Sequence, residues 1–286
     1  KYNEFKIKLA RQKKYIYNFN GKYSHSLNFF KSNILKKIKN IKPDIINLHW
    51  INNELISIKE ISKIDLPIVW TFLDMWPMLG GEHYTDDNRF IVGYDNSSMR
   101  NDESGIDINR YIWNKKKTFW KSKINHVICI SKWLKNSAEK SVLFKENEKS
   151  FVPCAINLKE WGSYEKKEAR KLLNLPDNKI ILLFMSTNGT KDFRKGFHFV
   201  ETSLKYVSNF HDDILLLNLG KNVLNKNSSE NMININNSFN GKPSKLKLYY
   251  SASDVLLTPS ILEALGQVAT EAATCGVPSI GFKETG

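Results

Sequence analysis

Two glutamates with a fixed spacing are the first residues of this chain that could do chemistry. Glu263 and Glu271 have seven residues between them and bracket the junction of a predicted strand at 254–257 and a predicted helix at 265–274. Ligands of open α/β sheets bind outside the carboxyl ends of the strands, so a site is predicted here. Glu271, on the helix, can accept hydrogen bonds from two neighbouring hydroxyls such as those of a ribose. Glu263 can hydrogen-bond a sugar hydroxyl or balance positive charge at an anomeric carbon.

The opening turn of the same helix offers donors for an anion. Backbone N–H groups in a first turn have no intrahelical partner, so those of Gly266, Gln267 and Val268 can hold a phosphate oxygen. Two arbitrary glutamates have a plainer explanation. An acidic residue near a helix N-terminus, such as Glu263, stabilises the helix by roughly 0.3–1 kcal/mol, and Glu271 would then be an ordinary surface residue. The surrounding pattern, with a Gly-Val-Pro turn after the helix, favours the site.

A basic pair precedes a glycine at another strand-to-helix loop. Arg194 and Lys195 stand before Gly196, between a predicted strand at 179–185 and a predicted helix at 196–207. Two cations fixed there would stabilise a leaving group that gains negative charge as its bond to the substrate breaks, more in the transition state than in the ground state. The chain holds 43 lysines and arginines, so only the position of the pair indicates a site. No Asp-x-Asp sequence occurs near this site, and no metal is expected.

Apolar patterning predicts the elements that position these residues. In the first half, strands are predicted at 45–50, 68–72, 126–130 and 150–154, and helices at 27–40, 54–64, 111–120 and 132–143. In the second half, strands are predicted at 179–185, 214–219, 254–257 and 278–282, with a weak one at 232–235, and helices at 167–173, 196–207, 243–250 and 265–274. Such alternation is typical of parallel α/β sheets with crossover helices.

The length of the chain predicts two domains. Its 286 residues exceed what one compact core usually holds. We place the domains at 1–158 and 159–286, with a linker around 157–167. A long segment at 75–107, rich in Gly, Asp, Asn and Ser, lacks periodicity, and such loops are usually functional or disordered.

These motifs together resemble the family-four retaining glycosyltransferases, in which two glutamates flank seven residues just after a strand end. The resemblance rests on the pair Glu263 and Glu271 with the turn that follows, and on the segments 43–50, 70–84 and 192–197. It implies the GT-B fold, with two Rossmann-like domains facing across a cleft. The N-terminal domain would take the acceptor and the C-terminal domain a nucleotide-sugar donor, with no cofactor and no metal.

The same resemblance implies a role for each site residue. Glu263 would orient the sugar, Arg194 and Lys195 the diphosphate, and Glu271 the ribose. The acceptor, a glycan or a lipid-linked glycan, would attack from the face that the diphosphate leaves, so the sugar would be transferred with retention. We expect the product to be a cell-surface polysaccharide.

The chain departs from the family pattern in several places. Leu73 stands where the family often has a histidine, and His83 in the following Gly-Gly-Glu-His loop is the nearest candidate for a catalytic role. A lone histidine in a loop more often has no such role. Pro-Cys-Ala at 153–155 replaces the family's Pro-Asn-Gly. The sequence starts with Lys1 in place of Met, and its last residues follow a strand-like run without completing a domain. These features predict a fragment lacking both termini, including the family's opening strand and glycine-rich loop.

The chain is strongly basic, with a formal charge of +14 and a pI near 9.5. A general bias toward Lys, Asn and Ile explains most of the excess. Basic segments at 1–14, 31–42 and 114–123 are interleaved with apolar residues, which suits a face on anionic lipid, where each Lys or Arg contributes about 1 kcal/mol. No nucleic acid is expected as a partner. The three cysteines are far apart and taken as reduced, so we predict a cytoplasmic protein, peripheral to the inner face of the membrane.

Two other functions stay open on the sequence. One is a GT-B sugar-nucleotide epimerase, which needs a water or histidine arrangement that the sequence does not identify. The other is a basic lipid- or RNA-binding protein on a decayed GT-B fold. Nucleotide titration separates the second from a transferase, because only a transferase needs to bind a nucleoside diphosphate.

Overall fold

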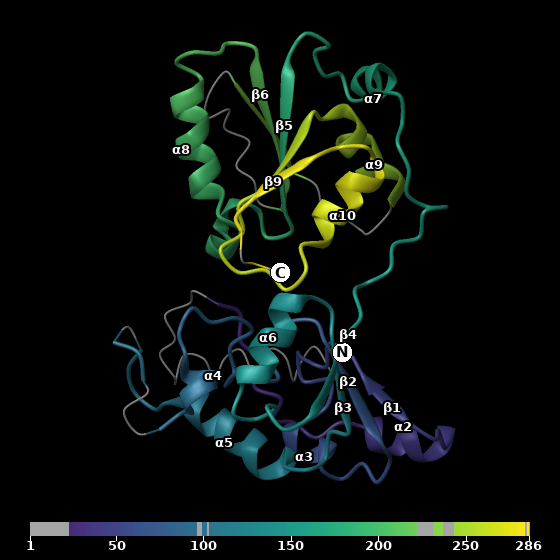
Figure 1. Ribbon diagram of the computed structural model, residues 1–286, viewed down its shortest axis with the longest axis vertical. Coiled ribbons are helices and arrows are strands. Elements are labelled where there is room, and N and C mark those ends of the chain that lie inside the picture. The colour runs from purple at the N-terminus through teal and green to yellow at the C-terminus, as the bar shows by residue number, and fades with distance from the viewer. Residues whose placement is uncertain are drawn as a thin grey trace. The chain divides into compact units, whose positions relative to one another are not determined.

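The computed structural model of the chain describes residues 23–95, 99–101, 103–221, 231–236, 243–283 and 285. The chain forms two compact units that divide between Pro153 and Cys154. Each unit is built around its own parallel sheet (Figure 1). The basic segment 1–14 and most of the weakly patterned stretch 221–241 lie outside the described residues.

The N-terminal unit holds a four-stranded sheet in the order β1-β2-β3-β4, with neighbouring strands parallel. Its strands are β1 Ile46–Leu48, β2 Ile68–Phe72, β3 His126–Cys129 and β4 Glu148–Phe151. Its helices are α2 Ile34–Ile41, α3 Ile58–Ile61, α4 Arg89–Val92, α5 Ile108–Trp120 and α6 Lys132–Lys140. The predicted parallel arrangement is confirmed, with all four strands in sequence order.

Aromatic side chains form much of the core of this unit. Trp70 on β2 lies edge-on to Trp120, with ring centres 4.9 Å apart, and Phe72 lies edge-on to Phe144 at 5.0 Å. Trp76 joins the same group, 5.8 Å from Trp120. Edge-to-face rings are favoured by their quadrupoles and bury large apolar areas. The cluster therefore anchors both the end of β2 and the start of the loop that follows it.

Two helices of this unit begin later than predicted. The prediction of a helix from residue 27 is wrong, because α2 begins at Ile34 and Asn28 has a left-handed backbone with φ of 50°. The prediction of a helix from residue 54 is wrong as well, because α3 begins after Ser57, which forms a capping box with Glu60. The Glu54 carboxylate instead accepts from the backbone N–H of Asn28 at 2.7 Å and holds the segment before α2.

The C-terminal unit holds a five-stranded parallel sheet in the order β7-β6-β5-β8-β9. Its strands are β5 Ile180–Ser186, β6 Ile214–Gly220, β7 Met232–Asn236, β8 Val255–Thr258 and β9 Ser279–Gly281. Its helices are α7 Lys166–Leu172, η2 Gly189–Lys191, η3 Phe193–Lys195, α8 Phe197–Val207, α9 Pro243–Ala252 and α10 Gln267–Thr274. The weak strand prediction is confirmed as β7. The first strand of the unit, β5, lies in the middle of the sheet. The chain adds β6 and β7 on one side of β5 and then β8 and β9 on the other side, so the winding reverses at the boundary between β5 and β8.

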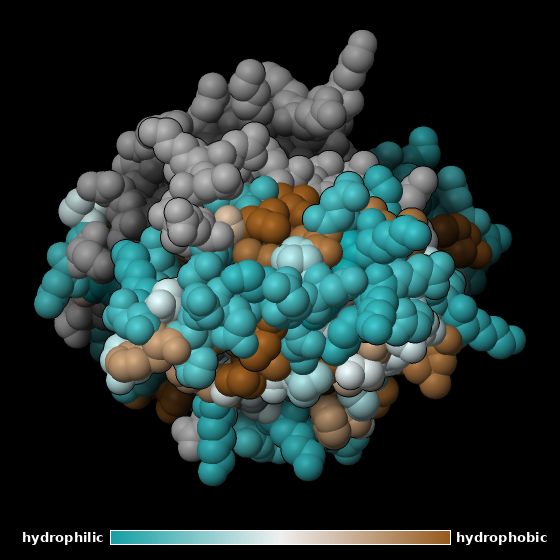
Figure 2. All heavy atoms as spheres, turned by 90° about the horizontal axis from the view of Figure 1, so that it is seen from above, coloured by the Kyte–Doolittle hydropathy of each residue, from teal (hydrophilic) through white to brown (hydrophobic). Residues whose placement is uncertain are grey.

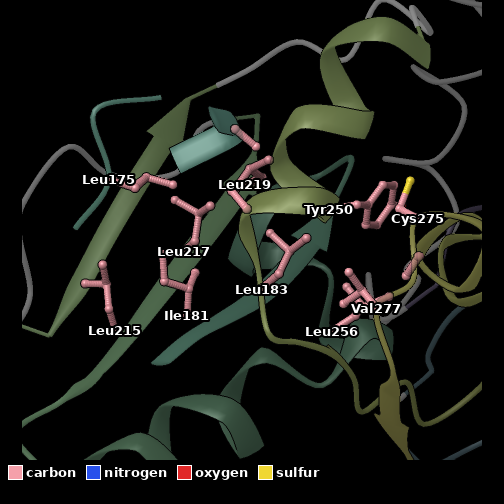
Figure 3. Close-up of a cluster of buried hydrophobic side chains, with 13 residues drawn as sticks. Leu175, Ile181, Leu183, Leu215, Leu217, Leu219, Tyr250, Leu256, Cys275 and Val277 are labelled. Carbon is pink, nitrogen blue, oxygen red and sulfur yellow. The ribbon is translucent and has the colours of Figure 1, made fainter. Parts of the chain in front are cut away.

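Apolar side chains cover both faces of the second sheet. Ile181 and Leu183 of β5 belong to the cluster in Figure 3, together with Leu217, Leu256 and Tyr250. Leu182 and Phe184, the alternate residues of β5, pack in a second cluster that includes side chains of α8. A parallel sheet covered on both faces needs nearly continuous apolar strands, which explains the unbroken apolar character of β5.

One face of the molecule can be followed in Figure 2. The face shown in Figure 2 is mostly hydrophilic, with hydrophobic residues gathered in smaller groups. Within the described ranges, every helix is too short or too polar to span a lipid bilayer.

Candidate functional site

Two loops meet at the carboxyl edge of the second sheet, where the winding reverses. One follows β5 and contains η3, and the other joins β8 to α10. The backbone N–H of Ile261 donates to the carbonyl of Arg194 at 2.8 Å and ties the loops together. Gly196 permits this approach, because its φ is 72° and a Cβ there would lie 2.0 Å from the carbonyl oxygen of Pro259. The two loops therefore place the predicted basic pair beside Glu263.

Glu263 binds the basic pair directly. Its Oε2 accepts from the Lys195 ammonium and, at 3.4 Å, from the Arg194 guanidinium. Ser260 Oγ donates to the same oxygen at 3.3 Å, and the backbone N–H of Ala264 donates to Oε1 at 3.2 Å. Burial acts to raise the pKa of Glu263, but the charges of Lys195 and Arg194 outweigh it and hold that pKa below its ordinary value. Glu263 is therefore an anion at neutral pH.

Arg194 is held by both loops. Its Nη1 donates to the carbonyl of Leu262 at 2.9 Å, and its Nη2 donates to Asp192 at 3.3 Å. A guanidinium that is positioned beforehand needs little reorganisation when negative charge develops near it. The arrangement can therefore stabilise an anion at the end of β5.

The N-terminus of α10 follows the Glu263 loop. Gly266 is its N-cap, with φ of 68°, and no side chain among the described residues caps this helix. Gln267 is exposed and Val268 half-buried. The three amides predicted to hold a phosphate oxygen thus lie together at an uncapped helix end, where the helix dipole also favours an anion.

Glu271 lies further along α10 and is paired with a tyrosine that the sequence analysis missed. The hydroxyl of Tyr250, near the end of α9, donates to Glu271 Oε2 at 2.8 Å. Burial raises the pKa of Glu271, and the hydrogen bond from Tyr250 offsets only part of this effect. Tyr250 is fully buried, with Trp161 6.0 Å from its ring centre. The sequence of α9 has two adjacent tyrosines and no local signal that tells which one meets the carboxylate.

The predicted catalytic residue of the N-terminal unit, His83, lies in a buried hydrogen-bonded chain. Its Nδ1 lies 2.7 Å from Asp74 Oδ2, and its Nε2 lies 2.8 Å from Ser26 Oγ. The residue is 6% exposed. Because both ring nitrogens are already engaged, this geometry suits a positioning role better than direct attack on a substrate. Ser26 and Asp74 are not selected by the sequence analysis as site residues.

Asp74 joins several groups at the end of β2. Its Oδ1 accepts from the backbone N–H of Trp76 at 3.0 Å, and its Oδ2 accepts from the indole N–H of Trp50 at 3.0 Å and lies against His83. Leu73, where the family often has a histidine, is half-buried. In this chain the imidazole beside Asp74 therefore comes from further along the loop that follows β2.

The long segment 75–107 is fastened to this unit by buried charges. Lys116 of α5 is fully buried, and its ammonium donates to three backbone carbonyls between 76 and 80 at 2.5 to 2.9 Å. Burial holds the pKa of Lys116 well below its ordinary value. Arg89 lies within salt-bridge distance of three carboxylates, including that of Glu82 at 3.4 Å. These contacts fix the Gly-Gly-Glu-His stretch that supplies His83.

The cysteines and other side chains that could bind a metal complete the description of the two units. Over the described ranges, no group of three or more His, Cys, Asp or Glu side chains is arranged to hold a metal ion. All three cysteines are free thiols: Cys129 and Cys275 are buried, and Cys154 is exposed. Burial raises the pKa of Cys129 to about 12, so this thiol is unreactive.

Comparison with known proteins places these features in a family context. Residues 165–286 match the family model described as glycosyl transferases group 1. No curated protein sequence matches the chain. Sucrose-phosphate synthase from Thermosynechococcus elongatus is similar in structure, with 18% identity, a TM-score of 0.62, and coverage of 87% of this chain and 58% of that one.

Two further solved structures have comparable similarity. HepE from Anabaena in complex with UDP and glucose has 13% identity and a TM-score of 0.58, with 88% of this chain and 63% of that one covered. WaaG, a glycosyltransferase involved in lipopolysaccharide biosynthesis, has 14% identity and a TM-score of 0.57, with coverage of 88% and 63%. The chain spans less than two thirds of the length of each of the three structures. It thus has two Rossmann-like units of the GT-B fold and, as its motifs predicted, resembles the group 1 glycosyl transferases.

Proposed function

We propose that this chain carries the donor and acceptor units of a retaining, metal-independent glycosyltransferase that moves a sugar from a nucleotide-sugar donor to a glycan or lipid-linked acceptor. The observation that carries the proposal is the convergence of Arg194, Lys195 and Glu263 where the second sheet reverses its winding. Ligands of such sheets bind at this place. The three residues also lie inside the stretch that matches the group 1 glycosyl transferases.

The donor diphosphate would lie between the basic pair and the first turn of α10. Without a ligand, Lys195 and Arg194 neutralise Glu263. An entering diphosphate would replace Glu263 as the anionic partner of the two cations. The Glu263 carboxylate would then be free to bind the sugar. Because the diphosphate gains charge as the glycosidic bond breaks, cations fixed beforehand stabilise the transition state more than the ground state. The HepE structure, which holds UDP and glucose on a similar fold, supports a nucleoside diphosphate as the ligand.

The ribose of the donor is assigned to Glu271. Tyr250 occupies Oε2 of this carboxylate, and we assign Oε1 to the ribose hydroxyls. The bond from the anomeric carbon to the diphosphate then breaks while the acceptor hydroxyl oxygen bonds to that carbon on the same face, and the hydroxyl proton passes to the departing diphosphate. The role in polysaccharide synthesis is supported by WaaG, which acts in lipopolysaccharide biosynthesis.

Calorimetric titration with UDP, ADP and GDP tests the donor site. We expect saturable binding of at least one of them, with the same affinity in EDTA and in added magnesium. Loss of binding in EDTA would show the metal-independent assignment to be wrong. A chain that binds none of the three but does bind RNA or lipid vesicles would be a binding protein, and one that converts a sugar nucleotide to its epimer without transfer would be an epimerase.

An anionic membrane surface is the partner that we assign to the N-terminal unit, with a location at the cytoplasmic face. None of the residues of α2 is buried, Lys36 and Lys39 are exposed, and Ile41 at its end is 73% exposed. An exposed helix with lysines on one face and aliphatic side chains on the other suits the interface of a bilayer.

Vesicle sedimentation tests this partner. Lys36→Ala with Lys39→Ala should weaken partition onto phosphatidylserine vesicles about thirtyfold, because each lysine contributes about 1 kcal/mol. Lys167→Ala with Lys171→Ala, two exposed positions in the other unit, is the matched control. Equal losses in the two double variants would mean that net charge alone drives adsorption.

A further inference from the structure

One tryptophan of the N-terminal unit is exposed where the others around it are buried. Trp50 follows the end of β1 and is 44% exposed, whereas Trp70, Trp76 and Trp120 belong to the buried aromatic core. An exposed indole leaves a large apolar area in water, and aromatic side chains that combine an apolar body with a polar handle are common at recognition surfaces. Packing in the aromatic core therefore does not explain why a tryptophan stands at the exposed position 50.

The indole of Trp50 is held in place by buried groups. Its N–H donates to Asp74 Oδ2 at 3.0 Å, and Asp74 is itself held by the Trp76 backbone and by His83. The imidazole of His83 lies 5.8 Å from the Trp50 ring, with 41° between the planes. Ser26 in turn holds the other nitrogen of His83. The buried hydrogen bonds from Ser26 through His83 to Asp74 therefore fix the orientation of the exposed Trp50 ring.

The position of this ring follows from the sheet. Leu48, the last residue of β1, pairs with Trp70, two residues before the end of β2, so the two parallel strands end at the same edge of the sheet. Trp50 and Asp74 each follow one of these ends by two residues. Ligands of parallel α/β sheets bind at this edge. The exposed ring therefore lies at the edge of the N-terminal sheet where a substrate would be expected.

We propose that the exposed face of Trp50 is a stacking platform for a neutral pyranose ring of the acceptor. This inference rests on the proposed function, and it adds the subsite and the class of ligand. The indole N–H is already bonded to Asp74, so the part of Trp50 left for a ligand is its π-face. The C–H face of a pyranose is apolar and flat enough to cover an indole, while its hydroxyls stay in water or reach polar groups. A ring that is already oriented loses little conformational entropy when a ligand binds.

Saturation-transfer NMR on the complete chain, with UDP present, tests the platform. The probes are the methyl pyranosides of glucose, galactose, mannose and N-acetylglucosamine. We expect at least one to receive saturation through its ring C–H protons, and Trp50→Ala to weaken its binding about tenfold, the loss of roughly one aromatic stacking contact. Trp50→Phe should retain part of the binding. Tyr111→Ala, which removes another exposed aromatic ring of the same unit, should leave it unchanged.

The outcomes separate this inference from the proposed function. Trp50→Ala should leave the affinity for UDP unchanged, since Trp50 lies in the other unit from the donor residues. The stacking proposal is wrong if UDP binds but none of the four glycosides does. It is also wrong if Trp50→Ala and Tyr111→Ala weaken glycoside binding equally. In both cases UDP binding would still support the proposed donor site. Trp50-dependent binding of single-stranded RNA without glycoside binding would also overturn it. Failure of the wild-type chain to bind UDP, ADP or GDP would instead count against the proposed function.

Discussion

The two units place carboxylates at corresponding edges of their sheets and hold them differently. Glu263 follows β8 and is paired with two cations. Asp74 follows β2, is 6% exposed, and accepts from Trp76 and Trp50 while lying against His83. Cations paired with a carboxylate can exchange it for an anionic ligand, whereas a buried hydrogen-bonded network fixes geometry. The comparison indicates that the site of the C-terminal unit, the proposed donor side, is built to exchange partners, and that the site of the N-terminal unit, the proposed acceptor side, is built to hold a shape.

The largest expected effect comes from removing the cations of the donor side. Arg194→Ala with Lys195→Ala should lower sugar-nucleotide turnover by a factor on the order of 10²–10³, because the leaving diphosphate loses donors fixed in advance. The melting temperature should change little by comparison. Lys191→Ala, an exposed lysine of the same loop, is the control in steady-state assays. An equal loss in that control would mean that the overall charge of the loop matters and not the placement of the pair.

Removing the second carboxylate of the donor side should weaken nucleotide binding. Glu271→Gln should lower affinity for a nucleoside diphosphate roughly tenfold to a hundredfold, since a hydrogen bond to a charged group is worth about 1.5–3 kcal/mol. Burial raises the pKa of Glu271 above its ordinary 4.5, so the wild-type carboxylate takes up a proton earlier on acidification. Affinity should therefore begin to fall at a pH above 4.5 in the wild type, with no such step in the variant. Calorimetry that finds the two pH profiles identical would rule out the ribose assignment.

The acceptor side should respond in stability and not in nucleotide affinity. Asp74→Asn leaves one of its buried donors without an acceptor and should lower the free energy of unfolding by about 1–3 kcal/mol, with UDP affinity unchanged.

Glu263→Gln is the counterpart in the C-terminal unit. The pKa of Glu263 is lowered in the folded state, so its contribution to stability is present above the ordinary 4.5 and is lost as pH falls through the folded value. Urea denaturation over a pH series should show an effect of Glu263→Gln that is largest at pH 7 and declines as the pH falls below 4.5; an effect that does not change with pH would contradict the charge pairing.

The smallest expected effect is that of the tyrosine behind Glu271. Tyr250→Phe removes one neutral donor and should weaken nucleotide binding about twofold to tenfold, the range of a hydrogen bond worth about 0.5–1.5 kcal/mol. Its neighbour gives the control, because Tyr249→Phe removes a hydroxyl that does not bond to Glu271. A larger loss in Tyr249→Phe would show that α9 acts through packing and not through this hydrogen bond.

Features set by local pattern could be predicted from the sequence. The apolar run of β2 was placed at its observed bounds, because a buried parallel strand needs continuous apolar residues. Ser131 was identified as the N-cap of α6, and its side chain accepts from the backbone N–H of Leu134 at 3.1 Å. The spacing of Glu263 and Glu271 and the position of the basic pair indicated the edge of the second sheet where Arg194 and Lys195 meet Glu263, since strand ends and helix starts are local features.

Contacts between distant segments were decided only by the tertiary structure. His83 bonds Ser26, 57 residues away in the sequence, and no periodicity or spacing connects them. The start of α2 is displaced by the Glu54 carboxylate, which binds the backbone before that helix. Tyr250 meets Glu271 only because α9 and α10 pack beside each other. The sequence alone determined most of the strands and helices and where ligands are expected, because periodicity and turn chemistry act locally. Which side chain meets which across the fold depends on how those segments pack.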